Sequence, residues 1–223
     1  MTTKAATIEG FPLQPNDVPH VQTGHRRIVT PIPVPASIPV IEKLRTYEPR
    51  SMGGQPLVIW DRAEGVHVFD RWGNMWLDWS SGVLVTNAGH NHPRVKQAML
   101  DQIHHGLVHN YCFPSEKRSE LADALVDVAP KGLDKVFLLT TGSEATECAI
   151  KLARSHGLSR SRQKLAIVTF HNAFHGRTLG AQMAGGIPSL KEWIVNLGKD
   201  LVQLPFPDGY RNKGTDLRAV RSG

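Results

Sequence analysis

LTTGSEA, residues 139–145, is the stretch of sequence that decides the fold. The apolar run ending at Leu139 predicts a buried strand, Gly142 permits a tight turn, and a helix is expected to begin at about Ser143. Such a corner gathers unpaired peptide N–H groups and the positive end of a helix dipole in one concavity. It predicts either a phosphate cradle, to which the hydroxyls of Thr141 and Ser143 would add hydrogen bonds, or simply a well-capped helix.

Strand and helix patterns alternate on the C-terminal side of Gly132. Buried-strand runs are expected at 136–139, at 165–168 and near 201–202, with a helix over 145–153. On that helix, Glu147 and Lys151 have the spacing of a supporting ion pair. The alternation predicts an α/β fold with a mostly parallel sheet and flanking helices, and residues 106–223 are interpreted as the first part of its large domain.

On the N-terminal side, short strand-like runs separated by turn residues predict a small antiparallel meander. The runs lie at 57–60, 66–69 and 75–78, and helices are expected to open at Pro93 and to follow Ser115. Residues 46–105 are interpreted as the N-terminal part of a small domain. Residues 1–45 are rich in proline and are expected to form an extended arm without a helix.

A second constellation of polar and aromatic residues follows the expected strand at 165–168. Ligands of α/β sheets bind at the carboxyl ends of the strands, where this chain reads FHGRT at 174–178. There Phe174 or His175 could lie flat on a planar heteroaromatic ring, and Arg177 could hold a carboxylate through two hydrogen bonds. A packed phenylalanine and a surface arginine are the alternative.

Composition argues against several classes of protein. The 223 residues are 40% hydrophobic and 21% charged, with no apolar run near the roughly 18 residues of a membrane helix. The net charge of +6 is scattered without aromatic platforms, so no nucleic-acid partner is expected. The histidines lack the further ligands of a zinc site, so no metal is expected. Two distant cysteines and no secretory pattern favour the cytoplasm.

Three motifs in this order resemble the class III, or omega, aminotransferases. They are GHNHP at 89–93, TGSEATE at 141–147 followed by KLAR at 151–154, and FHGRT at 174–178. The resemblance runs from about Leu57 to about Arg211. The family includes the 4-aminobutyrate, ornithine and acetylornithine aminotransferases. It implies a fold type I transferase dependent on pyridoxal 5′-phosphate, here incomplete, and it does not identify the substrate.

The resemblance also implies the positions of a cofactor site and a substrate site. The cofactor positions are Thr141, Gly142, Ser143, Phe174 and His175. The backbone amides of Gly142 and Ser143 would bind the phosphate with Thr141 nearby, and the phenylalanine would stack on the pyridine ring with the histidine adjacent. Arg177 resembles an arginine that holds a substrate carboxylate, and Val83 resembles a residue of the substrate pocket.

In the family, the Schiff-base lysine lies further along than Gly223, so no catalytic residue is expected in this chain and the chain alone is expected to be inactive. The full-length protein is expected to be a homodimer that moves an amino group from an amine or omega-amino acid to a 2-oxo acid. An aminomutase or decarboxylase of the same fold is one alternative, because one fold supports many chemistries. A non-catalytic truncated product is the other.

Overall fold

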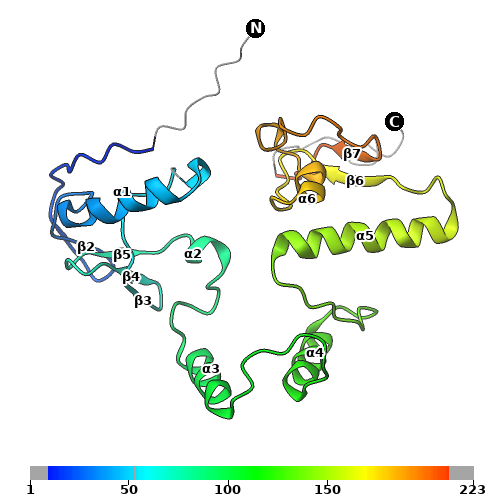
Figure 1. Ribbon diagram of the computed structural model, residues 1–223, viewed down its shortest axis with the longest axis horizontal. Helices are drawn as coiled ribbons and strands as arrows, with labels where there is room; N and C mark the ends of the chain where they lie inside the picture. The colour runs from blue at the N-terminus through cyan, green and yellow to red at the C-terminus, as the bar shows by residue number, and fades with distance from the viewer. Residues whose placement is uncertain (1–9, 53, 211–223) are drawn as a thin grey trace, which may run out of the picture. The chain divides into compact units, whose positions relative to one another are not determined.

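The computed structural model of the chain describes residues 10–52 and 54–210. The chain divides into two compact units, Met1–Phe113 and Pro114–Gly223. Each unit has its own sheet, antiparallel in the first and parallel in the second (Figure 1). Each is therefore described by itself.

The sheet of the first unit has five strands in the order β1-β2-β5-β4-β3, and all its pairs are antiparallel. The strands are β1 (Val21–Gln22), β2 (Arg27–Ile28), β3 (Arg62–Glu64), β4 (His67–Phe69) and β5 (Met75–Leu77). The predicted meander is confirmed, but its first strand lies at β3 rather than at 57–60. The reason is the two-residue turn at Gly65, which fixes the register so that Glu64 pairs with His67.

A helix, α1 (Ile38–Tyr47), lies where the sequence predicted none, so that expectation is wrong. Pro39 occupies the first turn of the helix, where no N–H is needed and where its fixed φ is already helical. A 3₁₀ turn, η1 (Pro35–Ser37), precedes the helix, and β1 and β2 belong to the sheet of the first unit. The described part of residues 1–45 is thus folded into the first unit, and residues 1–9 lie outside the described residues.

The two helices predicted near residues 100 and 120 are confirmed as α3 (Pro93–His105) and α4 (Glu116–Val128). Pro93 stands in the first turn of α3, and Gly106, with a φ of 92°, ends it in the left-handed conformation that glycine allows. Ser115 caps α4, because its hydroxyl accepts a hydrogen bond of 3.3 Å from the Arg118 peptide N–H. α3 belongs to the first unit and α4 to the second. The remaining short elements of the first unit are η2 (Arg50–Met52) and α2 (Ser81–Leu84).

The second unit begins with α4 and continues with α5 (Gly142–Arg160), β6 (Ile167–Phe170), α6 (Leu179–Ala184), η3 (Pro188–Leu190) and β7 (Leu201–Leu204). The parallel pairing of β6 with β7 confirms the predicted parallel sheet, and α6 packs against α5 (Figure 1). The strand predicted at 136–139 is wrong: no described strand pairs with this segment, and Phe137 is 67% exposed. A strand forms only where its peptide groups find a neighbouring strand.

Candidate functional site

The first turn of α5 is closed by a capping box. The Thr141 hydroxyl accepts from the Glu144 peptide N–H at 3.2 Å, and the Glu144 carboxylate accepts from the Thr141 peptide N–H at 3.2 Å. The same carboxylate also accepts from the hydroxyl and the peptide N–H of Thr140, and these bonds hold the pKa of Glu144 below its usual range. The helix start is thereby rigid, and it begins within one residue of the predicted Ser143.

Two peptide donors remain free at this helix start. The first intrahelical bond runs from Ala145 N–H to Thr141 C=O at 3.0 Å, so the N–H groups of Gly142 and Ser143 precede the ladder. Within the described part of the chain, neither of these two groups donates a hydrogen bond. A Cβ on Gly142 would meet nothing within 4 Å, so the space before the helix is open. An anion can approach both donors at the positive end of a 19-residue helix.

The FHGRT loop lies directly against this corner. Arg177 donates its peptide N–H to the Ser143 hydroxyl at 3.2 Å. Gly176 has a φ of 119°, and a Cβ there would overlap the Ser143 hydroxyl and lie 2.9 Å from the Ser143 Cα. Only glycine fits such a position, for both its conformation and its space. Two motifs more than thirty residues apart in sequence are therefore brought together at Ser143.

The aromatic part of the same loop follows the carboxyl end of β6. His171 N–H bonds to Leu204 C=O at 2.9 Å, and Gly186 holds the loop through bonds with Asn172 and Ala173 of 3.0 and 2.8 Å. Phe174 is 59% exposed, so it is not a packed core residue within this unit. His175 is half-buried beside it. The aromatic ring is available to a ligand, whereas its predicted stacking stays a prediction.

Glu147, one turn further along α5, does not form its predicted pair. Among the described residues Lys151 makes no ion pair with it, because the carboxylate instead accepts from the peptide N–H groups of Gly180 at 2.8 Å and Ala181 at 3.1 Å. The i,i+4 expectation was wrong, since a tertiary contact outcompetes an exposed pair that contributes only about 0.3–0.5 kcal/mol. No local pattern in the sequence indicates this contact.

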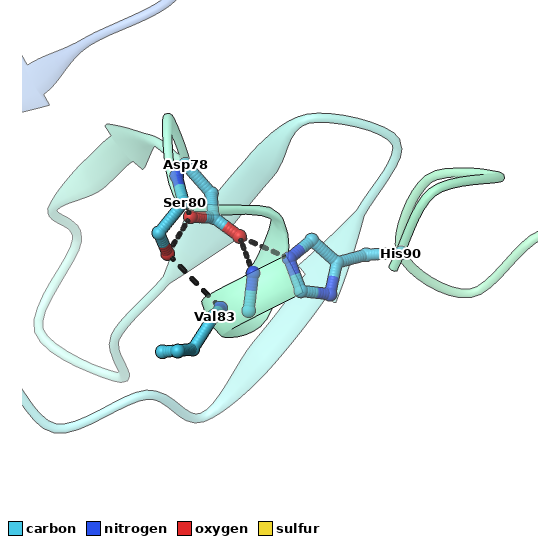
Figure 2. A network of polar contacts seen from close by, with 5 residues as sticks. Asp78, Ser80, Val83 and His90 are labelled. Atoms are coloured by element: carbon cyan, nitrogen blue, oxygen red, sulfur yellow. Dashed lines mark hydrogen bonds and ion pairs between the residues drawn. The ribbon is translucent and has the colours of Figure 1, made fainter. Parts of the chain in front are cut away.

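Val83 lies in the first unit, in a turn held by a buried carboxylate. Figure 2 shows Asp78 at its centre: its Oδ2 accepts from the Gly82 N–H at 2.6 Å and pairs with His90 Nε2 at 2.7 Å. Its Oδ1 accepts from the N–H and the hydroxyl of Ser80, at 2.9 and 2.6 Å. These bonds, led by that of the Ser80 hydroxyl, hold the pKa of Asp78 well below its usual range despite burial.

The turn itself is left-handed. Ser81, Gly82, Val83 and Leu84 have φ values of 51°, 61°, 63° and 66°, so α2 is not an ordinary right-handed helix. Such residues other than glycine cost about 1 kcal/mol each or more and persist only where the surroundings hold them. Here the Asp78 network supplies the restraint, and Val83 is left 77% exposed. Sequence reasoning found Val83 but missed Asp78, which looked like an ordinary residue at a strand end.

Asp78→Asn is expected to destabilise the first unit by about 2 kcal/mol at pH 7, because charge-assisted bonds are replaced by weaker ones. A carboxyl whose folded pKa is depressed contributes stability above its unfolded pKa of about 3.9, and loses it as the pH falls toward the folded value. The wild-type stability should therefore fall below about pH 4, and the variant should show a shallower fall. Denaturant unfolding followed by tryptophan fluorescence measures both; a variant with unchanged stability and pH slope contradicts the role of Asp78. Asp101→Asn, on the exposed face of α3, is the control.

No three histidine, cysteine, aspartate or glutamate side chains gather to hold a metal within residues 10–52 and 54–210. In the same residues no helix has the length and apolar character that crossing a bilayer requires.

Together, the parallel strand pair and the helices beside it define an α/β protein, in which the start of α5 presents two peptide donors that no described residue binds. The family model described as aminotransferase class-III matches residues 50–221, and the chain belongs to the class-III aminotransferases. The predicted family is confirmed. Its members depend on pyridoxal phosphate.

Several curated relatives and solved structures are similar to this chain. The acetylornithine aminotransferase of Methanopyrus kandleri is 36% identical over 65% of this chain and 36% of its own length. The acetylornithine aminotransferase of Xanthomonas campestris pv. campestris is 37% identical over 75% of this chain and 38% of its own length. The chain thus spans somewhat more than a third of these relatives.

Among solved structures, the taurine:2-oxoglutarate aminotransferase of Bifidobacterium kashiwanohense, in complex with pyridoxal phosphate and glutamate, is 26% identical with a TM-score of 0.69. The match covers 87% of this chain and 43% of the taurine:2-oxoglutarate aminotransferase. An (S)-enantioselective omega-transaminase of Thermomicrobium roseum is 28% identical with a TM-score of 0.65, over 78% and 38% of the two chains. The predicted fold type I is confirmed.

Proposed function

We propose that this chain carries the cofactor-phosphate site of a transaminase that moves an amino group from an amine or omega-amino acid to a 2-oxo acid. The observation that supports this is the pair of free peptide N–H groups at Gly142 and Ser143. The motifs that surround them belong to a family whose members depend on pyridoxal phosphate. By the same resemblance, the complete protein is expected to be a homodimer, and its cysteine content favours the cytoplasm.

The donors at the start of α5 fit a phosphate group. Two adjacent N–H groups and a helix dipole favour a dianion, and the open space before Gly142 leaves room for its oxygens. The hydroxyls of Thr141 and Ser143 already accept one hydrogen bond each, but a hydroxyl that accepts can still donate. Up to four donors can therefore converge on one anion at this corner.

The other predicted site residues receive roles from the resemblance. When bound, pyridoxal phosphate supplies an electron sink for the charge that develops on the substrate carbon. Phe174 would hold the ring by stacking, with His175 beside it. Arg177 would orient a substrate carboxylate through its exposed guanidinium, and Val83 would line the substrate pocket.

We further propose that none of this chain's lysines is the Schiff-base lysine, so the chain alone would bind the cofactor without catalysing transamination. The resemblance supports this, since no lysine in residues 1–223 stands in the family's lysine context. Reduction of the chain with borohydride in the presence of pyridoxal phosphate is expected to leave no single lysine stoichiometrically modified. One such modified lysine, found by mass spectrometry, would overturn this part of the proposal.

The cradle can be tested with pyridoxamine 5′-phosphate, the amine form of the cofactor, which binds without a covalent bond to lysine. Calorimetric titration of the chain should show an affinity for this compound at least about tenfold above that for pyridoxamine, because only the former offers a phosphate to the Gly142 and Ser143 amides. Equal affinity for the two compounds would contradict the proposed function.

A further inference from the structure

Glu147 closes the start of a second helix with its side chain. The N-cap residue of α6, Thr178, forms no side-chain cap of its own. The Glu147 carboxylate takes that place by accepting from Gly180 N–H at 2.8 Å and Ala181 N–H at 3.1 Å, the second and third residues of α6. The first N–H groups of a helix lack intrahelical partners, so this carboxylate satisfies two that would otherwise be unpaired at a half-buried contact between two helices.

The absence of a side chain on Gly180 lets the Glu147 carboxylate lie close to the backbone of α6. A Cβ on Gly180 would overlap the Glu147 Oε2 and lie 3.0 Å from its Cδ, so no other residue fits there without displacing the carboxylate. Ala181 is fully buried beside it. The Thr178 hydroxyl also bonds to the carboxylate and lowers the pKa of Glu147, which keeps the group charged.

Ser143 and Glu147 hold the two ends of one loop. They stand four residues apart, on the same face of α5 and one turn of about 5.4 Å along its axis. Ser143 holds the Gly176–Arg177 end through the bond to Arg177 N–H, and Glu147 holds the other end through Thr178, Gly180 and Ala181. The position of the FHGRT loop relative to the helix start therefore depends on these two side chains.

We propose that Glu147 is a positioning residue of the cofactor site, one that fixes the loop carrying Phe174 and His175 in register with the free N–H groups of Gly142 and Ser143. The proposal rests on the proposed function. Glu147 touches no ligand in this role: it acts through the loop.

The negative charge of Glu147 is compatible with a nearby anion site because the start of α6 neutralises part of it. A carboxylate on the helix whose start holds a dianion would weaken the binding of that anion by repulsion. The N–H groups and the dipole of α6 offset that charge, because they concentrate positive potential on the carboxylate. Glu147 can consequently hold the loop by strong charge-assisted bonds at a modest cost to the anion site.

Substitution of Glu147 tests the proposal in the chain as it stands. Glu147→Ala is expected to lower the affinity for pyridoxamine 5′-phosphate at least about tenfold, because the loop loses its second anchor. Glu147→Gln keeps one accepting oxygen of the same length and should lower it by about threefold only. Lys151→Gln, on the same helix and exposed, is the matched control and should bind as the wild type does.

A second measurement separates positioning from loss of folding. Gly180→Ala displaces the carboxylate by overlap, so it should reproduce the loss seen in Glu147→Ala. In the double variant Glu147→Ala/Gly180→Ala the overlap is gone, and the affinity should be no lower than that of Glu147→Ala alone. General destabilisation would instead make the two losses add. Circular dichroism of the bound compound provides a spectroscopic signature of ring orientation and should change in the same variants.

Each outcome decides between the claims. If the wild type binds pyridoxamine 5′-phosphate no better than pyridoxamine, the proposed function and this inference both fall. If the wild type shows the phosphate preference while Glu147→Ala and Gly180→Ala both bind pyridoxamine 5′-phosphate as tightly as the wild type does, this inference alone is overturned. If Lys151→Gln weakens binding as much as Glu147→Ala, the effect belongs to the helix in general, which also overturns it.

Discussion

Gly142→Pro is expected to lower the affinity for pyridoxamine 5′-phosphate by about 100-fold while leaving α5 folded. Proline has no peptide N–H, so the substitution removes one of the two free donors from the anion cradle. Hydrogen bonds to charged groups contribute about 1.5–3 kcal/mol, and the lost donor is central to the site. Affinity for pyridoxamine, which lacks the phosphate, should be unchanged.

The helix tolerates this proline for reasons visible in its first turn. Gly142 is the first residue of α5, where proline is favoured, and the N–H that proline lacks donates to none of the described residues in the wild type. The preceding residue, Thr141, has φ −139° and ψ 161°, which is the extended conformation that a residue before proline prefers. The substitution thus removes the peptide donor while the helix start stays folded.

Gly142→Ala is the matched control, because it keeps the N–H and its Cβ would meet nothing within 4 Å. It should bind pyridoxamine 5′-phosphate as the wild type does, and calorimetry of the three proteins gives the comparison directly. If the proline variant retains wild-type affinity, the Gly142 amide does not bind the phosphate.

The start of α5 at 141–145 could be predicted from sequence because its determinants are local. Thr141 and Glu144 close a capping box within four residues, and Gly142 leaves the approach open, so the helix start needs no distant partner. The same holds for α3, which opens at Pro93 and ends at Gly106. Local signals of this kind predict the helix boundaries and the candidate cradle.

Features that depend on distant partners were missed or misplaced. The segment 136–139 has the composition of a strand, but a strand needs a neighbour that the described residues do not provide. Glu147 has an i,i+4 partner in sequence, yet the peptide donors of Gly180 and Ala181, more than thirty residues away, bind it instead. The restraint that Asp78 places on the left-handed turn was also missed: its bonds to Ser80 and Gly82 are local, but its burial and its pairing with His90, twelve residues away, are set by the folded unit.

Gly176→Ala is expected to lower the affinity for pyridoxamine 5′-phosphate by at least about 100-fold and to lower the melting temperature of the chain. An alanine at a φ of 119° is strained, and its Cβ would overlap the Ser143 hydroxyl. It would also lie 2.9 Å from the Ser143 Cα, a backbone atom that cannot rotate away. The loop must therefore leave the helix start, and Phe174 and His175 move with it.

Gly106→Ala separates the two causes of that loss, which are backbone strain at a positive φ and overlap with Ser143. Gly106 also has a positive φ, of 92°, but a Cβ there would meet nothing within 4 Å. This variant should cost about 1 kcal/mol of stability from backbone strain alone and should bind pyridoxamine 5′-phosphate as the wild type does. Because Gly176 lies against Ser143 at the start of α5, a Gly176→Ala protein that binds with wild-type affinity would mean that contact between the FHGRT loop and Ser143 is not needed for the site.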